Sequence, residues 1–433
     1  MDVQIGLLGC GTVGAGVVEL TRRRVEKIEG LTGFHPVIKR ILVRDVDKPR
    51  AVQLDKGILT SAFEEIIRDE DIKLVIETIG GIEPAKQYIL ASLRARKHVI
   101  TANKDLIALH GPEILDMAEQ MGVDVFYEAA VGGAIPLIRP LTESLTANNI
   151  TDLKGILNGT TNYILSKMTD TGADFEDVLK EAQDLGYAES NPSSDVDGLD
   201  TARKLTILAT IAFHAKVKLE DVRVNGIRNI TAADVSYAHE LGAVIKLLAV
   251  GSDVDGVISL HVSPTLIPKN HPLAHVSDAF NALFVRGDAA GDLMFFGRGA
   301  GSLPTASAVM GDVIEVLRNL RLGVAGRVGQ VTMSHKVVSN QPVQAVRHYL
   351  RLSVLDRPGV FAQIAGIFGE HEVSMETVLQ KRVKEGGAEV VVVTHAVPTA
   401  QLDRVLERLS SLDAVQQLHC VMPVETDTEA VEE

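Results

Sequence analysis

VQIGLLGCGTVGAGVVELTRRR, residues 3–24, is the stretch that decides the fold of this chain. A short apolar run leads into a glycine-rich turn, and the residues after the turn have the apolar spacing of a helix face. Gly9, Gly11 and Gly14 form the pattern GxGxxG between the predicted strand and the predicted helix. Without Cβ atoms the turn can be tight, and a pyrophosphate can approach the N–H groups at the helix N-terminus. The stretch therefore predicts a dinucleotide site, with a purely structural glycine turn as the alternative.

The pattern continues through the first third of the chain as an alternation of strands and helices. Apolar runs at 37–44, 74–81 and 98–104 are typical of buried strands, and residues 84–96 have helical spacing. Such an alternation predicts right-handed βαβ crossovers and a parallel, doubly wound sheet. Paired glycines and a proline interrupt it within residues 123–138, where we expect a functional junction.

The rest of the chain has a different organisation. Residues 152–168 predict a strand, a polar turn and a helix, and residues 200–216 and 232–250 predict long helices. A glycine turn in 295–320 feeds a helix that could return to the first domain, and the pattern after 346 has the ferredoxin-like order βαββαβ. The expected domains are a dinucleotide-binding domain at 1–135, an α+β catalytic and dimerisation domain at 136–320, a linker at 321–346, a ferredoxin-like domain at 347–425 and a disordered acidic tail at 426–433.

Composition and charge exclude several classes of protein. The 433 residues suggest two or three domains, and no window approaches the ~20 apolar residues that a membrane span requires. The N-terminus lacks the basic start of a signal peptide, so we expect a cytoplasmic protein without a membrane partner. Cys10 and Cys420 offer neither a disulfide framework nor a metal-ligand spacing. A net charge of −14 argues against nucleic-acid binding.

The end of the second predicted strand bears on the choice of dinucleotide. An acidic residue there would hold a ribose 2′-hydroxyl, whereas an arginine would accept a 2′-phosphate. The chain offers both, as Arg44 and Asp45, followed by Lys48 and Arg50. The three cations near Asp45 favour NADP over NAD, although a solvated loop has the same composition.

The stretch at 185–205 gathers four carboxylates and a lysine, namely Glu189, Asp195, Asp197, Asp200 and Lys204. Asp200 and Lys204 are four residues apart, so on a helix both side chains share a face. A capped helix with a surface ion pair is the alternative explanation. In an enzyme that transfers hydride from an alcohol, a lysine could take the hydroxyl proton and nearby carboxylates could bind a cationic amino group.

Three other places carry candidate polar groups. Lys104 lies just past the end of a predicted strand, where open α/β sheets bind ligands, although lysines are also common on surfaces there. The bend that begins at Glu128 can coordinate a monovalent cation through successive oxygens, or it can merely turn the chain. Asn158, Thr160 and Asn162 are expected to be turn and N-cap residues.

Together these motifs resemble homoserine dehydrogenase of the monofunctional type, followed by a C-terminal ACT domain. The resemblance spans nearly the whole chain up to the tail. Its motifs are GLLGCGTVG (6–14), ITANK (100–104), EAAVGGAIP (128–136), GILNGTTNYIL (155–165), LGYAESNPSSDVDGLDTARKL (185–205) and GRGAGSLPTASAVMGD (297–312).

The resemblance implies interconversion of L-homoserine and L-aspartate 4-semialdehyde with NAD(P), on the route to threonine, methionine and isoleucine. It assigns Lys204 as the proton donor and acceptor, with Lys104 as its partner, and Glu189 as the residue that binds the substrate ammonium group. The other implied substrate residues are Asp200, Thr160, Tyr187 and Asp195. The implied cofactor residues are Gly9, Gly11, Thr12, Val13, Gly14, Arg44, Gly80, Thr101, Lys104, Gly186 and Gly301. No segment resembles an aspartate kinase, so one activity is expected.

The resemblance also implies a cation, an effector and an oligomer. Glu128, Val131, Gly133 and Ile135 match the family's monovalent metal bend, most of them through main-chain carbonyls, and the expected ion is Na⁺. Some members read VGAGLP where this chain reads VGGAIP. In the ACT domain the turn from Asp356 to Gly359 would hold an amino acid, with Pro358 presetting the first helical residue. L-Threonine is the expected effector, a ligand-free packing module is the alternative, and a homodimer or higher homo-oligomer is expected.

Two other functions are alternatives to this interpretation. Another Rossmann dehydrogenase with an ACT tail would rely on a catalytic histidine, but His110, His214, His239 and His271 do not form such a constellation in the sequence. A non-catalytic sensor of NADP and amino acids would be expected to have lost the lysines or the carboxylates.

Overall fold

The computed structural model describes residues 1–325, 334, 336–339, 341–382 and 387–425. The chain divides into two compact units. The first contains residues 1–150, residues 203–219 and the described part of 286–335, and the second contains residues 151–202, residues 220–285 and the described residues from 336 onward. Much of the expected linker and the whole of the expected acidic tail lie outside the described residues.

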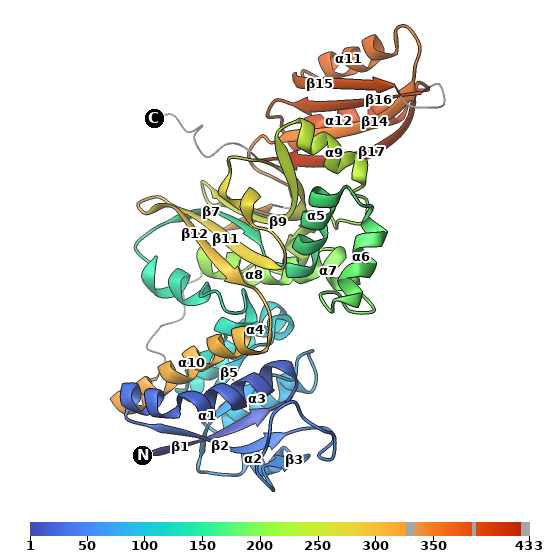
Figure 1. Ribbon diagram of the computed structural model, residues 1–433. Coiled ribbons are helices and arrows are strands. Elements are labelled where there is room, and N and C mark those ends of the chain that lie inside the picture. Colours follow the sequence, from blue (N-terminus) through green and yellow to red (C-terminus); the bar gives the residue numbers. More distant parts are fainter. Residues whose placement is uncertain (326–333, 335, 340, 383–386, 426–433) are drawn as a thin grey trace. The chain divides into compact units, whose positions relative to one another are not determined.

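The first unit contains a six-stranded parallel sheet, as the sequence predicts (Figure 1). Its order is β3-β2-β1-β4-β5-β6, so the strand order reverses beside β1, and open sheets bind ligands outside the carboxyl ends at such a point. The strands are β1 (Asp2–Leu8), β2 (His35–Leu42), β3 (Leu59–Thr60), β4 (Ile72–Glu77), β5 (His98–Thr101) and β6 (Val125–Phe126).

Two long helices that are far apart in the sequence pack together in this unit. Helix α1 (Thr12–Thr32) crosses α10 (Ser302–Leu322) so closely that a Cβ atom on Gly16 would lie 2.6 Å from the carbonyl oxygen of Ser302. Apolar residues of both helices and of β1 form one core. The remaining helical elements are α2 (Glu64–Ile67), α3 (Ala85–Arg94), α4 (Lys104–Met121), η1 (Glu128–Ala130) and η2 (Pro140–Ser144).

A larger mixed sheet has the order β12-β11-β7-β9-β10-β17-β14-β16-β15, with the short strands β8 and β13 beside β10. Its strands before the ACT region are β7 (Ile150–Ile156), β8 (Arg223–Val224), β9 (Ala243–Val254), β10 (Val257–Pro268), β11 (Phe280–Gly287), β12 (Gly291–Arg298) and β13 (Val337–Ser339). The helical elements of this region are α5 (Gly159–Thr171), α6 (Phe175–Asp184), α7 (Ser193–Val196), α8 (Leu199–Ala212), η3 (Leu219–Asp221), α9 (Ala232–Glu240) and η4 (Pro272–His275).

The prediction of one helix over 232–250 is wrong. Helix α9 ends at Glu240, Gly242 has a φ of 71°, and residues 243–254 form β9. Most of the first nine residues of β9 are buried, so their apolar spacing suits a buried strand as well as a helix. Antiparallel pairing with β10, from Val257 opposite Val254 to Pro268 opposite Ala243, stabilises the strand. The sequence pattern also gave no signal for β10 and β11.

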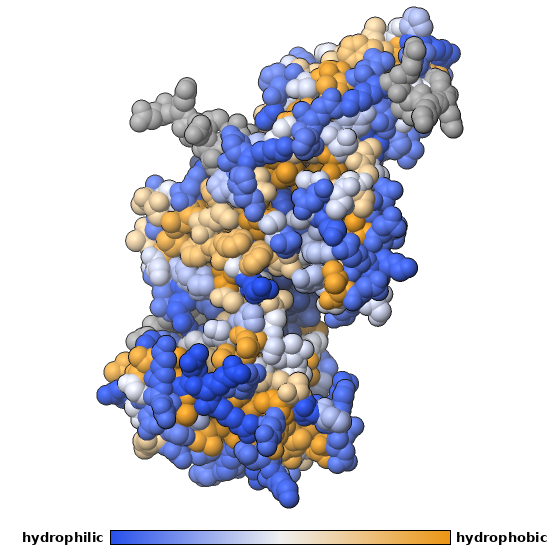
Figure 2. Space-filling model, viewed as in Figure 1, coloured by the Kyte–Doolittle hydropathy of each residue, from blue (hydrophilic) through white to orange (hydrophobic). Residues whose placement is uncertain are grey.

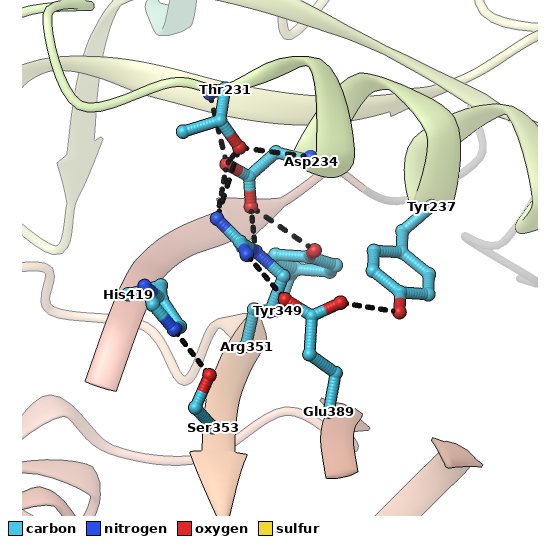
Figure 3. Close-up of polar contacts among 8 residues, drawn as sticks. All are labelled: Thr231, Asp234, Tyr237, Tyr349, Arg351, Ser353, Glu389 and His419. Carbon is cyan, nitrogen blue, oxygen red and sulfur yellow. Dashed lines mark hydrogen bonds and ion pairs between the residues drawn. The ribbon is translucent and has the colours of Figure 1, made fainter. Parts of the chain in front are cut away.

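The last part of the second unit has the predicted order βαββαβ. Its elements are β14 (Arg347–Leu355), α11 (Val360–Glu370), β15 (Met375–Arg382), β16 (Gly387–Thr394), α12 (Thr399–Ser410) and β17 (Val415–Val424). Leu350, Leu352 and Val354 on β14 join a core with residues of α11 and α12. Because successive side chains of a strand point to opposite faces, Tyr349 and Arg351 face the other way, toward α9 (Figure 3).

Among the described residues, none of the helices combines the length and the apolarity needed to cross a membrane. Hydrophilic residues cover much of the face shown in Figure 2, and hydrophobic residues gather over the region of β11 and β12. Phe296 on β12 is 55% exposed and Met294 is 36% exposed.

Candidate functional site

The glycine-rich turn has the geometry that close approach of a phosphate requires. Gly9 has a φ of 96°, and a Cβ atom there would lie 2.9 Å from the carbonyl oxygen of Thr78. A Cβ atom on Gly14 would lie 2.3 Å from the carbonyl oxygen of Gly9, so these two glycines are needed for the turn itself. Gly11 is the N-cap of α1, and a Cβ atom there would meet no described atom within 4 Å. The N-terminus of α1, at Thr12 and Val13, is therefore open to an anion.

Gly301 lies beside this turn, although 290 residues of sequence separate Thr12 from Ser302. The Ser302 hydroxyl donates to the carbonyl oxygen of Thr12 at 2.7 Å, and Gly301 is the N-cap of α10 with a φ of 123°. Two helix N-termini, those of α1 and α10, therefore start close together.

Glu77, which the sequence analysis did not single out, orders the adjoining strand ends. Its carboxylate is fully buried and accepts the N–H groups of Ile79 at 2.7 Å and Gly80 at 3.1 Å. It also accepts the Thr101 hydroxyl at 2.5 Å. Gly80 and Thr101 are thus brought together at the carboxyl ends of β4 and β5. The only signal in the sequence is an acidic residue that ends an apolar strand shortly before two glycines.

The basic loop after β2 approaches the glycine-rich turn. Arg44 is exposed, and the Asp45 carboxylate accepts the N–H of Asp47 at 2.9 Å. Arg50 hydrogen-bonds the carbonyl oxygen of Asp45, while its buried Nε has no hydrogen-bond partner among the described residues. Burial raises the pKa of the Cys10 thiol, and the Arg50 charge partly offsets this effect.

Lys104 is the first residue of α4 and lies three positions after Thr101, the last residue of β5. Asn103 caps the helix by accepting the N–H of Leu106 at 3.1 Å, and its amide donates to the carbonyl oxygen of Gly81 at 2.6 Å. Lys104 therefore lies at the ligand-binding edge of the parallel sheet.

An ion pair joins the start of α4 to α8. Arg203 and Asp105 lie 3.0 Å apart, and each is the chain neighbour of a candidate lysine, Lys204 and Lys104 respectively. Asp200 and Lys204 lie one turn apart on α8, and they are only 2% and 9% exposed. This burial is incompatible with the alternative of a solvated surface ion pair.

Asn158 connects two of the candidate carboxylates. Its side-chain amide donates to Asp195 Oδ1 at 2.7 Å and to Asp200 Oδ2 at 2.9 Å. Its oxygen accepts the N–H of Thr161 at 2.9 Å, so the predicted N-cap of α5 is confirmed. The starts of α5, α7 and α8 are therefore tied together around one amide.

The loop after α6 carries the other expected substrate residues. The Thr160 hydroxyl donates a hydrogen bond to the carbonyl oxygen of Tyr187 at 2.7 Å. The centroids of the Tyr187 and Tyr163 rings lie 4.7 Å apart. Gly186 has a φ of 77°, and the Glu189 side chain is exposed. Asp197 differs from its acidic neighbours because it forms an ion pair with Arg228 in which both side chains are about 40% exposed. We assign Asp197 to the solvated surface.

Lys246 on β9 is a buried cation that sequence reasoning missed. Its ammonium donates to Asn162 Oδ1 at 3.1 Å, Ser166 Oγ at 3.2 Å and the carbonyl oxygen of Val276 at 2.6 Å. Burial lowers its pKa to about 8, against the opposite effect of Asp170 and Asp278. The amide of Asn162 in turn donates to three carbonyl oxygens, those of Val276, Asp278 and Phe280. Lys246 and Asn162 thereby fix α5 against β9 and the segment 276–280.

The bend at 128–136 uses the Glu128 carboxylate structurally. This carboxylate accepts the N–H groups of Leu137, Ile138 and Arg139 at 2.6, 2.9 and 2.8 Å. Within the described parts of the chain, no three His, Cys, Asp or Glu side chains are grouped so that they could hold a metal ion. A cation at this bend would therefore be held by main-chain oxygens, which suits the expected carbonyl ligands Val131, Gly133 and Ile135.

Comparison with known proteins identifies the family of these domains. Residues 9–128 match the family description "Homoserine dehydrogenase, NAD binding domain", residues 136–314 match "Homoserine dehydrogenase" and residues 348–414 match "ACT domain". Homoserine dehydrogenase of Bacillus subtilis is 44% identical over 98% of both chains, and that of Synechocystis is 46% identical over 98% of this chain and 100% of the relative.

Comparison with a solved structure supports the same family. The crystal structure of a homoserine dehydrogenase from Thiobacillus denitrificans matches with a TM-score of 0.92 and 40% identity over 98% of both chains. The chain belongs to the homoserine dehydrogenase family. It is accordingly an oxidoreductase with a Rossmann-like domain for a nicotinamide cofactor, a catalytic domain and a C-terminal ACT domain. The expected fold class and family resemblance are confirmed, and the rival of a different ACT-linked dehydrogenase is excluded.

In this homoserine dehydrogenase the expected effector turn lies at the start of α11. Gly359 is the N-cap with a φ of 89°, and Val360 is the first helical residue. Pro358 therefore precedes the cap, and the prediction that it presets the first helical residue is wrong. Pro358 and Gly359 are exposed, while Asp356 is half-buried.

Proposed function

We propose that the chain interconverts L-homoserine and L-aspartate 4-semialdehyde by hydride transfer with NADP. In the direction of oxidation, Lys204 would take the hydroxyl proton, with Lys104 as the partner of Lys204. A bound nicotinamide would supply the hydride acceptor for the carbon that bears this hydroxyl. Asp200, Asp195 and Glu189 bind the substrate ammonium group, with Thr160 and Tyr187 in the same pocket. The observation that carries this proposal is the buried pair Asp200 and Lys204 on one helix face. The Asp105–Arg203 ion pair supports the partnership of the two lysines.

Replacement of the lysines tests the mechanism. We expect Lys204→Ala to lower kcat for NADP-dependent oxidation of L-homoserine by roughly 10²- to 10⁴-fold, since that is the usual contribution of a general base. Lys216→Ala is the matched control, because Lys216 is exposed and lies shortly after the same helix. Binding of NADP, measured separately, should survive in both variants. Unchanged turnover in Lys204→Ala would remove this lysine from the mechanism.

The proposed cofactor is NADP, with NAD as the alternative. Its pyrophosphate would lie at Gly9, Gly11, Thr12, Val13 and Gly14, and Gly80, Thr101, Lys104, Gly186 and Gly301 would line the rest of the cofactor. The orphaned Nε of Arg50 and the exposed Arg44 favour a 2′-phosphate at the end of β2. If so, Arg44→Ala and Arg50→Ala should lower kcat/KM with NADP much more than with NAD. An equal loss with both cofactors would contradict the assignment.

Three further proposals concern the cation, the effector and assembly. A monovalent cation, Na⁺, would be held by carbonyl oxygens of Glu128, Val131, Gly133 and Ile135.

L-Threonine would bind at the ACT turn of Asp356, Pro358 and Gly359, and it should then raise the thermal unfolding midpoint, since a ligand of the folded state stabilises it. If threonine, isoleucine and methionine leave the thermal midpoint unchanged, the ACT domain is better explained as a packing module.

The exposed Phe296 and Met294 on β12, an edge strand of the larger sheet, support a homodimer or higher homo-oligomer. A cytoplasmic location stays a prediction from the sequence.

A further inference from the structure

The Asn158 side chain makes more hydrogen bonds than a helix cap requires. Capping of α5 uses only its oxygen, which accepts the N–H of Thr161 at 2.9 Å. Serine or aspartate would serve equally well in that role. The side-chain nitrogen takes no part in the cap. It donates hydrogen bonds to the carboxylates of Asp195 at 2.7 Å and Asp200 at 2.9 Å. Of the residues preferred at an N-cap, only asparagine has an amide that can donate twice while its oxygen caps.

The two carboxylates come from different elements and would otherwise repel each other. Asp195 belongs to the short helix α7 and Asp200 to the first turn of α8. Two carboxylates in one place disfavour each other's charged form, whereas hydrogen bonds from N–H donors favour it. One neutral amide that serves both therefore keeps two negative charges close together and sets their spacing. Asn158 is itself buried, so its own position is fixed by the protein.

We propose that Asn158 is a positioning residue for recognition of the substrate ammonium group. It acts through Asp195 and Asp200, which it holds at the spacing that a cationic amino group requires. This inference rests on the proposed function, in which these carboxylates bind the ammonium group of L-homoserine. It gives Asn158 a part in substrate specificity, since a substrate without the amino group gains nothing from the paired charges.

The variant Asn158→Ser separates positioning from capping. Serine keeps the cap of α5 but cannot bridge the two carboxylates, so α5 should stay capped and the thermal midpoint should fall only by the loss of the two bridging hydrogen bonds. The KM for L-homoserine should rise by roughly ten- to a hundredfold, the usual effect of lost hydrogen bonds to charged groups. The KM for NADP should stay unchanged. Turnover of 4-hydroxybutyrate, an alcohol of similar length without the amino group, should be reduced little or not at all.

A double-mutant cycle tests whether the effect passes through the carboxylates. In an Asp195→Ala background, the further change Asn158→Ser should raise KM by much less than it does alone, because part of the bridge is already absent. Multiplicative effects of the two changes would overturn the proposal. So would an unchanged KM in Asn158→Ser, or equal losses of activity with both alcohols. If the unchanged protein does not oxidise L-homoserine, the proposed function fails first, and this outcome is distinct from failure of the variant alone.

Discussion

Glu77 is one of several buried polar side chains on which the candidate site depends. Its carboxylate collects two backbone N–H groups and a hydroxyl from two neighbouring strands. Lys246 on β9 collects three acceptors in the same way. A buried charge is stable only when its hydrogen bonds are satisfied, so each of these residues fixes the groups around it.

Removal of Glu77 should therefore affect both stability and cofactor binding. Glu77→Ala leaves the N–H groups of Ile79 and Gly80 and the Thr101 hydroxyl without their acceptor, and we expect a loss of about 2–4 kcal/mol in the free energy of unfolding. The KM for NADP should rise as the strand ends lose their order. Glu77→Gln keeps the shape and one good acceptor, so its effects should be smaller. Urea unfolding and steady-state kinetics measure both effects, and equal stability of the alanine variant would contradict this account.

Because of Lys246, the free energy of unfolding should depend on pH between about 8 and 10.5. Burial lowers its pKa from 10.5 to about 8, so between these values the unfolded chain binds more protons than the folded one. The free energy of unfolding should rise as pH increases over this range, and this contribution is lost as pH falls through about 8. The contribution is at most about 3 kcal/mol.

The variant Lys246→Met isolates this effect from other alkaline titrations. Urea unfolding of both proteins across the same pH range should give a flatter dependence for the variant. If the pH dependences of the two proteins are parallel, the pKa of Lys246 does not differ between the folded and the unfolded state.

At the scale of elements, the crossing of α1 and α10 brings the glycine-rich turn and Gly301 together. The crossing depends on Gly16, whose missing side chain lets the backbone of Ser302 approach. The contact also includes the Thr21 hydroxyl, which lies 3.5 Å from the Met310 sulfur. The position of Gly301 beside the glycine-rich turn is therefore a property of helix packing and not of either turn alone.

Two glycines of α1 provide a matched pair of variants. In Gly16→Ala the new Cβ would lie 2.6 Å from a backbone oxygen, so the helices must separate, and we expect a loss of roughly 1–3 kcal/mol. Gly30→Ala meets no described atom within 4 Å and should stabilise the helix by roughly 0.5–1 kcal/mol. Thermal unfolding of the two variants should shift in opposite directions. A shift in the same direction for both would argue against the close crossing.

At the largest scale, a buried ion-pair cluster joins the ACT domain to the rest of the second unit (Figure 3). Arg351 on β14 donates to Asp234 of α9 at 2.7 and 3.0 Å and to Glu389 of β16 at 2.8 Å. Tyr237 of α9 donates to the other oxygen of Glu389 at 2.8 Å. Burial lowers the pKa of the Arg351 guanidinium, but the bonds to Asp234 and Glu389 outweigh this and raise it, so the residue stays charged. The ACT domain is therefore docked against α9 as well as tethered by the chain.

Breaking this cluster should uncouple the ACT domain from α9. Arg351→Met leaves Asp234 buried without its main partner, and we expect a loss of roughly 3–5 kcal/mol. Calorimetry of this variant should show a separate, earlier transition for the ACT domain. Lys381→Ala is the control, because the ion pair of Lys381 with Glu240 is nearly half exposed and should contribute under ~1 kcal/mol. A calorimetric profile of Arg351→Met that matches the control would contradict the docking role.

Local sequence patterns predicted much of the fold and the positions of several candidate residues on its elements. The GxGxxG turn, the spacing of Asp200 and Lys204, the cap at Asn158 and the order βαββαβ all follow from local periodicity and turn chemistry. The same periodicity failed at 243–250, where burial on both faces made a strand resemble a helix. It also gave no reason to separate Asp197, paired with Arg228, from its acidic neighbours.

The sequence by itself determined the parallel sheet, the glycine-rich turn and the residues placed one helical turn apart, because these depend on neighbours within a few positions. Only the tertiary structure decided that Glu77 orders two strand ends, that Lys246 is buried, that Gly301 meets the first turn and that Asn158 serves two carboxylates. These contacts join segments far apart in the chain. Their energies depend on which buried polar groups find partners, and a one-dimensional pattern does not contain that information.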